Sequence, residues 1–440
     1  MNNQTIVSLI TPPLNGAVAV IRISGDEALQ IANDIFSKKI SEPNKVLYGT
    51  ILDHEEKIDQ VVLTYFAGPR SFTGEDVIEI SCHGSMLIAN QIISLIISKG
   101  ARMAERGEFS SRAYFNNKID LVQAEAILSM VEATSIEAKK LALYSLEGQT
   151  SSLLKPIITQ LADLLSNIEV NIDYPEYEDI EEVTIYRVQH ECDEMINTLS
   201  SLLNQSKKSQ YFVKGIKVAL VGLPNTGKSS LLNAFLNQDK AIVTDIPGTT
   251  RDIVEGDINL DGLPLHLLDT AGIRHADNKV EQIGIEKSQQ SIDEADLVIM
   301  VLDSSRNLTP EEDELLNLIK NKNHIIVYNK ADLLENLDQD KLYISALNKD
   351  ISKLKEEIKK MFNLSINDDT PSLCSARQIG LLEKARANLV KANEDALNNL
   401  PIDLVSISIK QCYDTLKDIL GLNVNVDLSE EIFSRFCVGK

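Results

Sequence analysis

The sequence lacks the closely spaced cysteine pairs that build disulfide frameworks and zinc knuckles. It has five cysteines, an odd number, which lie far apart and include no Cys-x-x-Cys pair: Cys82, Cys192, Cys374, Cys412 and Cys437. This spacing argues against both structures and favours a reducing compartment. The sequence also lacks an apolar run of about 18 residues and a basic segment ahead of a long apolar run at its start. We therefore expect a soluble, cytoplasmic protein that does not bind a membrane.

Positive charge is also scarce, with 43 Lys and Arg against 65 Asp and Glu, a net charge of −22. An average surface of this kind repels a polyanion such as nucleic acid. The acidity is unevenly distributed, because residues 1–118 carry 11 basic and 13 acidic residues, a net charge of −2. Any contact with nucleic acid should therefore be local or shared with a partner.

Proline and glycine are few, 12 and 20 among 440 residues, and 43% of the residues are hydrophobic. This composition excludes collagen-like, disordered and low-complexity classes. The length predicts about two to four domains.

Hydrophobic periodicity divides the chain into α/β and helical regions. Short β-like runs alternate with helical patterns such as 86–98 near the start, and a second alternating region begins with KVALVG at 217–222. Apolar residues recur at helical spacing from about 120 to 170 and from 376 to 420. Since each helical flank could complete the apolar face of the other, we predict that the second α/β region is inserted between them. The predicted domains are an α/β domain at 1–118, a discontinuous helical domain at 119–214 and 366–440, and an inserted doubly wound α/β domain at 215–365.

The segment GLPNTGKSS at 222–230 matches the G-x-x-x-x-G-K-S phosphate-binding loop between a strand and a helix. Glycines allow several backbone N–H groups to converge on phosphate oxygens, and the following helix N-terminus favours negative charge. Lys228 would reach the β- and γ-phosphates, and Ser229 would bind Mg²⁺.

Three further motifs follow in the order that a GTPase requires. LPLHLLDTAG at 263–272 ends a strand with Asp269, which should hold Mg²⁺ through water, and Gly272 can donate its N–H to a γ-phosphate. HIIVYNKAD at 324–332 brings Asp332, whose carboxylate accepts from both the N1–H and the amine of guanine, donors that adenine does not offer together. ISAL at 344–347 completes the base pocket with Ser345 and Ala346.

The position that holds a water-orienting Gln in Ras-like proteins is Ile273, which has no polar side-chain atom. Another group must therefore orient the attacking water. AIVTDIPGTTRD at 241–252 is a candidate first switch, in which Thr250 can reach Mg²⁺.

At this point the sequence resembles the MnmE (TrmE) family of tRNA-modification GTPases over nearly its whole length. The segments that narrow the resemblance lie outside the GTPase motifs: TIVSLITPP, AVAVIRISG, GPRSFTGEDVIEISCHG, GEFSSRAYFNNKIDLVQAEAI and FCVGK. The resemblance implies a GTP hydrolase that acts with an FAD-dependent partner, MnmG. Together they add an aminomethyl or carboxymethylaminomethyl group to C5 of the wobble uridine of certain tRNAs, using 5-formyl- or methylene-tetrahydrofolate as the one-carbon donor. It further implies a homodimer formed through the N-terminal domain and a heterotetramer with MnmG.

The resemblance also implies roles for individual residues. Family GTPase domains use K⁺ in place of an arginine finger, and the matching K⁺ ligands are Asn225, Thr244, Ile246 and Thr249. Glu281 matches the glutamate that orients water. The complete predicted nucleotide site comprises Asn225, Thr226, Gly227, Lys228, Ser229, Ser230, Thr244, Asp245, Ile246, Thr249, Thr250, Asp269, Thr270, Ala271, Gly272, Asn329, Lys330, Asp332, Ser345 and Ala346.

For the folate, the matching residues are Arg22, Glu79, Lys118 and Lys440. A carboxylate suits the donors of a pterin ring, and cationic side chains suit the glutamate tail of a folate. Taken alone, each of these residues would instead be interpreted as a strand-end salt-bridge residue. Residues 99–118 also contain five basic and two acidic residues, which suggests a local anion-binding surface.

Some interpretations stay open. Cys437 is either a catalytic thiolate or a buried small apolar residue, and His83 is either catalytic or a satisfied core histidine. Gln378 departs from the His that relatives often carry. The competing functions are a regulatory GTPase of ribosome assembly, which would need a C-terminal RNA-binding module that the sequence does not display, and an N-terminal folate-dependent transferase with a merely regulatory GTPase.

Overall fold

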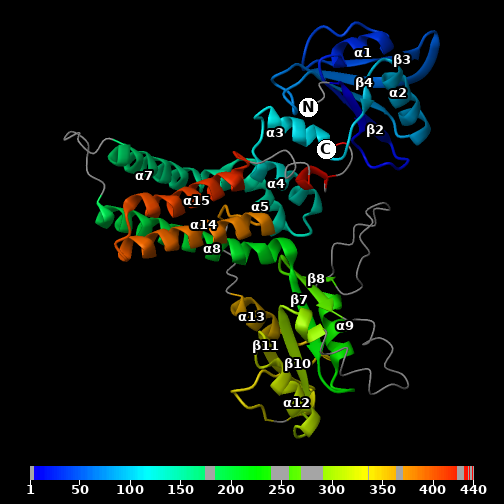
Figure 1. The fold of residues 1–440 in the computed structure, drawn as a ribbon. Helices are drawn as coiled ribbons and strands as arrows, with labels where there is room; N and C mark the ends of the chain where they lie inside the picture. The colour runs from blue at the N-terminus through cyan, green and yellow to red at the C-terminus, as the bar shows by residue number, and fades with distance from the viewer. Residues whose placement is uncertain are drawn as a thin grey trace.

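A computed structural model of the chain describes residues 4–173, 184–238, 257–268, 291–334, 336–362, 370–423, 431–434, 436 and 439. Figure 1 shows an N-terminal α/β domain, a long helical bundle and a second α/β domain that follows the end of helix α8. The predicted mixture of α/β and all-helical domains is therefore confirmed.

The N-terminal domain is built on a six-stranded sheet in the order β3-β4-β5-β2-β1-β6. All neighbouring pairs are antiparallel except β1 and β6. Helices α1 and α2 pack on one face, where alternate strand residues are buried with them. Its elements are β1 (Ile6–Leu9), β2 (Val18–Ser24), α1 (Ala28–Ile35), β3 (Val46–Asp53), β4 (Glu56–Phe66), β5 (Val77–His83), α2 (Met86–Ser98), β6 (Arg102–Met103) and α3 (Glu108–Phe115).

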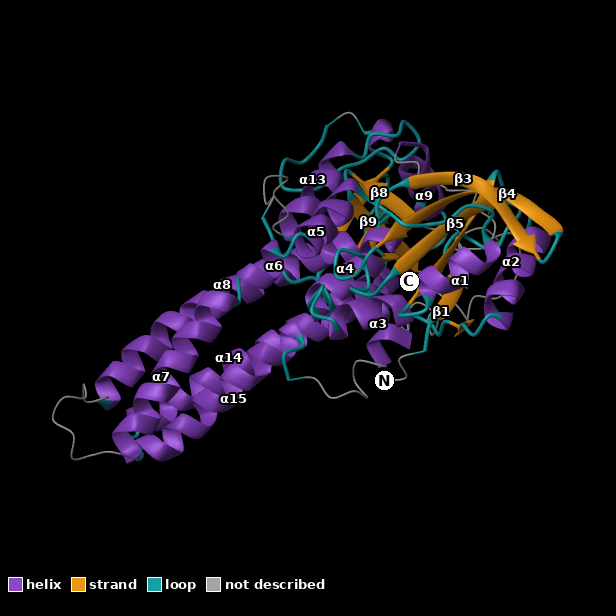
Figure 2. Cartoon of the chain, turned by 90° about the horizontal axis from the view of Figure 1, so that it is seen from above, coloured by secondary structure: helices purple, strands orange, loops and turns teal. Residues whose placement is uncertain are grey.

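The helical domain joins segments from both sides of the inserted domain. Its elements are α4 (Leu121–Glu132), α5 (Ile136–Leu146), α6 (Gln149–Ser152), α7 (Lys155–Asp173), α8 (Ile185–Lys214), α14 (Ala376–Leu397) and α15 (Ile402–Leu420). Helices α7, α8, α14 and α15 share one buried cluster and form a rod that extends away from the N-terminal domain (Figure 2). The two helical flanks therefore bury their apolar faces against each other.

The inserted domain has a five-stranded sheet in the order β11-β10-β7-β9-β8, parallel except for the β8–β9 hairpin. Strand β7 is buried on both faces, which explains its continuous apolar run. Helices α9 and α13 pack on one face and α12 on the other. The elements are β7 (Ile216–Val221), α9 (Lys228–Gln238), β8 (Asp257–Leu260), β9 (Leu263–Leu268), β10 (Leu297–Asp303), α12 (Pro310–Ile319), β11 (His324–Asn329), the short 3₁₀ helix η1 (Ala331–Leu333) and α13 (Ser352–Met361).

Aromatic side chains connect the domains in the described parts of the chain. Tyr211 and Phe212, in the last turn of α8, pack against the core of the inserted domain, and the Tyr211 ring lies 4.9 Å from that of Phe362. The C-terminal segment returns to the N-terminal domain, where Phe433 and Phe436 pack beside Tyr114. The C-terminal segment therefore packs against the N-terminal part of the chain.

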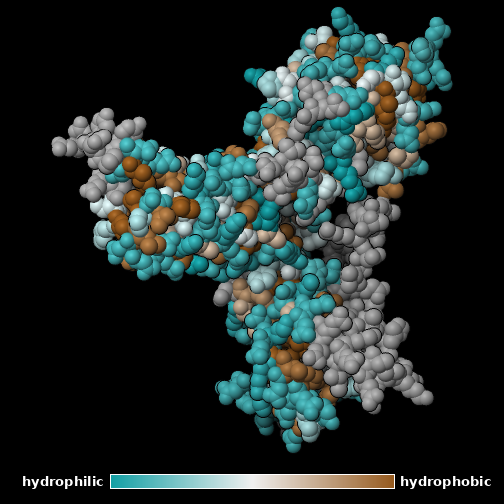
Figure 3. Space-filling view, in the orientation of Figure 1, coloured by the Kyte–Doolittle hydropathy of each residue, from teal (hydrophilic) through white to brown (hydrophobic). Residues whose placement is uncertain are grey.

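The visible surface is mostly hydrophilic, and hydrophobic side chains gather over the free end of the helical bundle (Figure 3). Exposed apolar residues of α7 and α15 include Val170, Ile172, Leu404 and Ile407. None of the described helices is both long and apolar enough to cross a membrane.

Candidate functional site

A tight loop connects β7 to α9 at the carboxyl edge of the inserted sheet. A Cβ built on Gly222 would lie 2.4 Å from the carbonyl oxygen of Val301, and one on Gly227 would lie 2.0 Å from Nδ2 of Asn329. Both glycines also have positive φ angles, 153° and 98°, so both positions require glycine. Because α9 begins at Lys228, directly after the loop, the free backbone N–H groups of its first turn lie next to this loop.

Lys228 folds back over the loop. Its Nζ donates to the carbonyl oxygens of Gly222, at 2.6 Å, and Leu223, at 2.8 Å. Burial lowers the pKa of Lys228. Among the described residues the ammonium group is held at the loop by these carbonyl dipoles, and a phosphate at this position would supply a negative charge.

Asn329 joins the phosphate-binding loop to the predicted base pocket. Its side chain is buried, with Nδ2 donating to the carbonyl oxygen of Thr226 at 2.9 Å and Oδ1 accepting from the N–H of Ala346 at 3.0 Å. Three segments that are far apart in the sequence are thus fixed to one amide. This brings the motifs at 222–230, 324–332 and 344–347 together, as predicted.

The Asp332 side chain lies at the start of η1 and is held by Ser345. Ser345 Oγ donates to Asp332 Oδ1 at 2.6 Å and accepts from the N–H of Asn348 at 3.3 Å. Asp332 is exposed, so the carboxylate is oriented by one hydroxyl and still accessible to a ligand. A carboxylate in this position can accept two hydrogen bonds from guanine.

The remaining predicted nucleotide residues divide into two groups. Asn225, Ser229 and Ser230 are exposed in the loop and the first turn of α9, and Asn225 has a φ of 63°. The residues that lie outside the described parts of the chain are Thr244, Asp245, Ile246, Thr249, Thr250, Asp269, Thr270, Ala271, Gly272 and Glu281.

Arg22 and Glu79 face each other on adjacent strands of the N-terminal sheet. Arg22 Nη2 and Nε both donate to Glu79 Oε1, at 2.8 and 2.9 Å. The guanidinium group also lies 5.2 Å from the ring centre of Phe72 and 5.5 Å from that of Phe109. The interpretation of these two residues as a salt bridge is therefore correct, and two aromatic rings also lie close to the Arg22 guanidinium group.

Lys118 lies at the other side of the loop that carries Phe72. Its Nζ donates to the carbonyl oxygen of Pro69 at 2.7 Å. An open polar hollow of about 410 Å³ lies here, lined by Asp26, Pro69, Gly74, Glu75, Asn116 and Lys118. Arg22 and Lys118 thus each contact a residue of this loop, Glu79 pairs with Arg22, and Lys440 lies outside the described residues.

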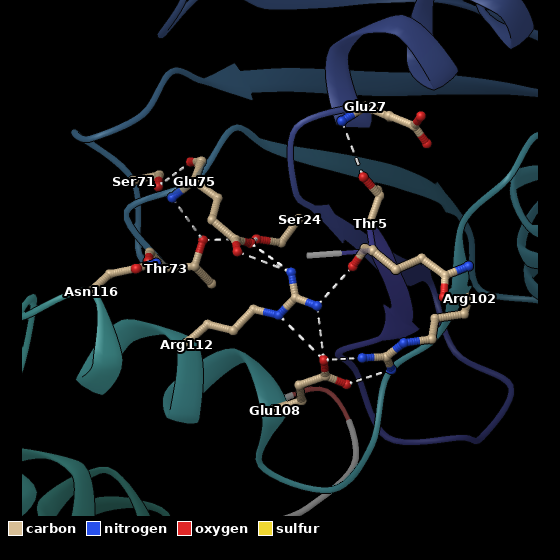
Figure 4. Close-up of polar contacts among 11 residues, drawn as sticks. Thr5, Ser24, Glu27, Ser71, Thr73, Glu75, Arg102, Glu108, Arg112 and Asn116 are labelled. Atoms are coloured by element: carbon tan, nitrogen blue, oxygen red, sulfur yellow. Dashed lines mark hydrogen bonds and ion pairs between the residues drawn. The ribbon is translucent and has the colours of Figure 1, made fainter. Parts of the chain in front are cut away.

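A buried cluster of charged side chains fixes this loop to α3 (Figure 4). Arg112 is only 7% exposed and donates to both carboxylate oxygens of Glu75, at 3.0 Å each, and to Glu108 Oε1 at 2.9 Å. Glu108 also pairs with Arg102, and Glu75 accepts from Ser24 at 2.6 Å. The cluster therefore sets the position of the 68–76 loop relative to β2 and α3.

The same cluster involves two of the five basic residues at 99–118, the stretch for which a local anion-binding surface was predicted. Arg102 and Arg112 are engaged in internal ion pairs with Glu108 and Glu75. Burial would raise the pKa of Glu108, but the hydrogen bonds from Arg102, the Glu105 N–H and Arg112 lower it overall. Part of the positive charge that the sequence suggests is neutralised inside the domain.

A comparison with family models decides the identity of this arrangement. Residues 121–437 match the model described as the MnmE helical domain, and residues 5–118 match the GTP-binding protein TrmE N-terminus. The chain belongs to the MnmE (TrmE) family of tRNA modification GTPases. Full-length relatives include a protein named tRNA modification GTPase MnmE from Streptococcus thermophilus, 41% identical over 99% of this chain and 98% of the relative. One of the same name from Streptococcus sanguinis is 42% identical over 99% of both chains.

Part of this chain is similar to solved structures. The G domain of the FeoB iron transporter from T. maritima is 26% identical, with a TM-score of 0.24, over 33% of this chain and 98% of that one. The inserted domain of this MnmE family member, which carries the GTPase motifs, is called the G domain below.

His83 is not a core histidine, so that interpretation is wrong. Its side chain is 70% exposed, and its Nδ1 lies 2.7 Å from Oδ1 of Asp59, a carboxylate that is only 8% exposed. The N–H of His83 also donates to Asp59 Oδ2 at 2.8 Å. Asp59 therefore fixes both the backbone and the ring of His83 at the end of β5.

The four described cysteines are structural, and Cys437 lies outside the described residues. Burial raises the pKa of Cys82 to about 11 and that of Cys192, Cys374 and Cys412 to about 12. Gln378, which replaces a frequent family His, accepts from the N–H of Ser375 in the capping box of α14.

Sequence reasoning missed Asp59, Glu75 and Arg112, because their partners come from distant segments whose register the sequence does not display. It also missed Asp303, for which a signal existed, since VLD ends a buried strand at the edge where the phosphate loop begins. Within the described parts of the chain, no group of three or more His, Cys, Asp or Glu side chains is arranged to hold a metal ion.

Proposed function

We propose that GTP hydrolysis by this MnmE family member depends on K⁺ and controls the modification of C5 of the wobble uridine in certain tRNAs. The modification adds an aminomethyl or carboxymethylaminomethyl group with an FAD-dependent MnmG-type partner and a tetrahydrofolate one-carbon donor. The single observation that carries the nucleotide part is the Asn329 amide, which fixes the phosphate loop and the base-binding segments to each other. The family relationship supports the tRNA part.

The described residues divide the work of GTP binding between base and phosphates. Asp332, oriented by Ser345, accepts from the guanine N1–H and amine, which selects guanine over adenine. Lys228 moves from the loop carbonyl groups to the β- and γ-phosphates, where its charge is neutralised. The first N–H groups of α9 donate to the same phosphates, and Ser229 with Thr250 would hold Mg²⁺.

For K⁺, the ligands in this proposal are Asn225, Thr244, Ile246 and Thr249. Asn225 fits the role because it is exposed in the phosphate loop and carries an amide oxygen, which is a ligand that hard cations prefer. A bound K⁺ would place positive charge beside the phosphate oxygens where an arginine finger is lacking. Glu281 would orient the water that Ile273 cannot hold.

The test compares GTP turnover by the full chain in KCl and in NaCl at equal ionic strength. Turnover in KCl should exceed that in NaCl by about tenfold or more, because only one of the two ions fits the site. Asn225→Ala should remove most of this difference, and Thr250→Ala or Glu281→Ala should suppress turnover in KCl. Equal rates in the two salts would contradict the K⁺ mechanism and leave GTP binding intact.

The folate site in this proposal comprises Arg22, Glu79, Lys118 and Lys440. The Arg22–Glu79 pair offers a carboxylate for a pterin ring next to the aromatic side chains of Phe72 and Phe109. Gly439 packs against the backbone of Leu9, and the adjacent Ser8 lies opposite Arg22 in the sheet. The C-terminal segment therefore approaches the Arg22 region, which supports a role for Lys440.

The same proposal includes a homodimer, a heterotetramer with the flavoprotein and a cytoplasmic location, where tRNA is found. The face of the N-terminal sheet opposite α1 and α2 supports the dimer, because it exposes the apolar side chains of Val18, Val46, Tyr48 and Val62. A surface of this kind on a sheet is typical of an interface between protein chains.

A further inference from the structure

Asp303 lies at the carboxyl end of β10, one strand away from the predicted guanine site. In the register of the parallel β10–β11 pair it is opposite Asn329, and the Ser304 N–H donates to the carbonyl oxygen of Asn329 at 2.9 Å. The carboxyl ends of parallel strands meet at one edge of a sheet, which is where nucleotides bind in open α/β sheets. Asp303 is therefore beside the base-binding segment through the topology of the sheet.

The Asp303 carboxylate is enclosed by three donors. Its Oδ2 accepts from Lys330 Nζ at 2.5 Å, and its Oδ1 accepts from the N–H and the Oγ of Ser305, at 3.0 and 2.6 Å. The Asp303 side chain is 10% exposed. Burial raises its pKa, but the bonds from Lys330 and Ser305 outweigh this effect and hold the pKa at about 2. The carboxylate is thus ionised near neutral pH and is held in place by Lys330 and Ser305.

Lys330 connects this anchor to the base site. It lies between Asn329 and η1 with a φ of 68°, a left-handed conformation that turns the chain toward Asp332. Lys330 lies two positions before Asp332, and its ammonium group is held at β10, so its four-carbon stem extends from the start of η1 toward β10. A pinned lysine stem forms an apolar surface of the kind that packs on a flat ring.

We propose that Asp303 is a positioning residue for nucleotide binding: it holds Lys330 so that the lysine stem forms one wall of the guanine site. This inference rests on the proposed assignment of guanine to Asp332. Because the Lys330 ammonium is paired with Asp303, its charge holds the lysine stem in place and does not interact with the phosphates. Loss of the anchor should therefore weaken GDP and GTP binding by the same factor.

The test measures the binding of fluorescent GDP and of a non-hydrolysable GTP analogue to the full chain. Asp303→Asn should weaken both by about tenfold, the effect of one lost charge-assisted hydrogen bond. The loss should be equal at pH 6 and pH 8, because Asp303 is ionised at both. In turnover the loss should appear in KM and not in kcat, since the chemistry of the phosphates is untouched.

A double-mutant cycle separates positioning from folding. Lys330→Gln, at the 33% exposed end of the contact, should weaken GDP binding as Asp303→Asn does, and the double variant should bind no more weakly than the worse single variant. Asp261→Asn is the matched control, since it removes an ion pair with Lys359 at the β8–β9 turn of the same domain. The control should bind GDP like the unchanged protein.

The outcomes distinguish this inference from the function on which it rests. GDP binding by Asp303→Asn within twofold of the unchanged protein, or additive losses in the double variant, would overturn the positioning role. Asp332→Asn tests the site itself, because it should abolish the preference for guanine. If that preference survives in Asp332→Asn, the assignment of the base site fails instead. If Asp303→Asn does not fold, Lys330→Gln alone decides, and an unchanged affinity would overturn the proposal.

Discussion

At the scale of single residues, the nucleotide site depends on close backbone approach as much as on side-chain chemistry. Gly227 touches the Asn329 amide that holds the loop and the base segment together. A methyl group in this position would meet Nδ2 of Asn329 at 2.0 Å, and a φ of 98° disfavours any side chain there. The steric clash and the backbone strain would therefore both disturb the contact between Gly227 and Asn329.

Gly227→Ala should therefore weaken GDP binding about tenfold to a hundredfold, because backbone strain and displacement of Asn329 together cost a few kcal/mol. Gly380→Ala is the control, since the space around Gly380 in α14 is empty and alanine favours a helix. The control should bind GDP normally and melt at the same or a higher temperature. Calorimetric titration of both variants measures the effect, and equal affinities would show that the loop tolerates the methyl group.

The residue scale also shows what could be predicted from the sequence. The spacing of the G-x-x-x-x-G-K-S and NKAD motifs is local, so Lys228 and Asp332 were predictable and the structure brings their segments together. His83 was ambiguous, because the residue that fixes it, Asp59, is on a neighbouring strand 24 positions away. A pairing of this kind depends on the strand register, which local patterns do not specify.

At the scale of elements, the positions and lengths of helices could be predicted well where apolar residues recur clearly at helical spacing. The helical pattern at 86–98 became α2 with the same bounds, and within the predicted helical region 120–170 the apolar residues Ile157, Leu161, Leu164 and Ile168 are buried along α7. Helix α8 was not predicted as one 30-residue element, although its buried residues Val188, Cys192, Met195, Leu199 and Leu203 recur at intervals of three and four. The many polar residues of α8 concealed this stripe, which is buried together with apolar residues of α14.

The uncovered sheet face makes a prediction at this scale. Tyr48, Val62, Ser81 and Val20 form one row across β3, β4, β5 and β2, because each is opposite the next in the register. A charge in the centre of this row would have to be desolvated if two sheets met. Val62→Lys should therefore turn a dimer into a monomer.

Light scattering coupled to size-exclusion chromatography measures the mass of each variant. Leu87→Lys is the matched control, because Leu87 is equally apolar and 70% exposed but lies on α2, which covers the opposite face. The control should remain a dimer. A monomeric unchanged protein, or a dimeric Val62→Lys variant, would contradict dimerisation through this face.

At the scale of the whole molecule, three buried cores are joined by few contacts, and charge is distributed unequally among the domains. The helical bundle, the N-terminal sheet and the G domain each have a separate hydrophobic cluster. The N-terminal domain carries −2 of the total charge of −22, and two of its arginines are neutralised by buried carboxylates. Neither the acidic remainder nor the stretch at 99–118 thus supplies a large basic surface for tRNA.

If the proposed function holds, this distribution predicts that the reaction on tRNA requires the flavoprotein partner. The full chain with its partner, GTP, KCl and a methylene-tetrahydrofolate donor should produce the modified wobble uridine, which nucleoside mass spectrometry detects. Omission of the partner should abolish the product, because this chain alone offers tRNA little positive charge. Omission of the folate should abolish it as well, since no other one-carbon source is present.

Two variants assign the result to the sites. Asp332→Asn, which loses guanine recognition, should lower product formation in GTP, and Glu79→Gln should lower it by weakening the folate site without changing GTP turnover. Unmodified tRNA under the complete conditions would contradict the proposed reaction. Product formation by the chain alone would instead show that this acidic protein binds tRNA directly and that the reaction does not need the partner.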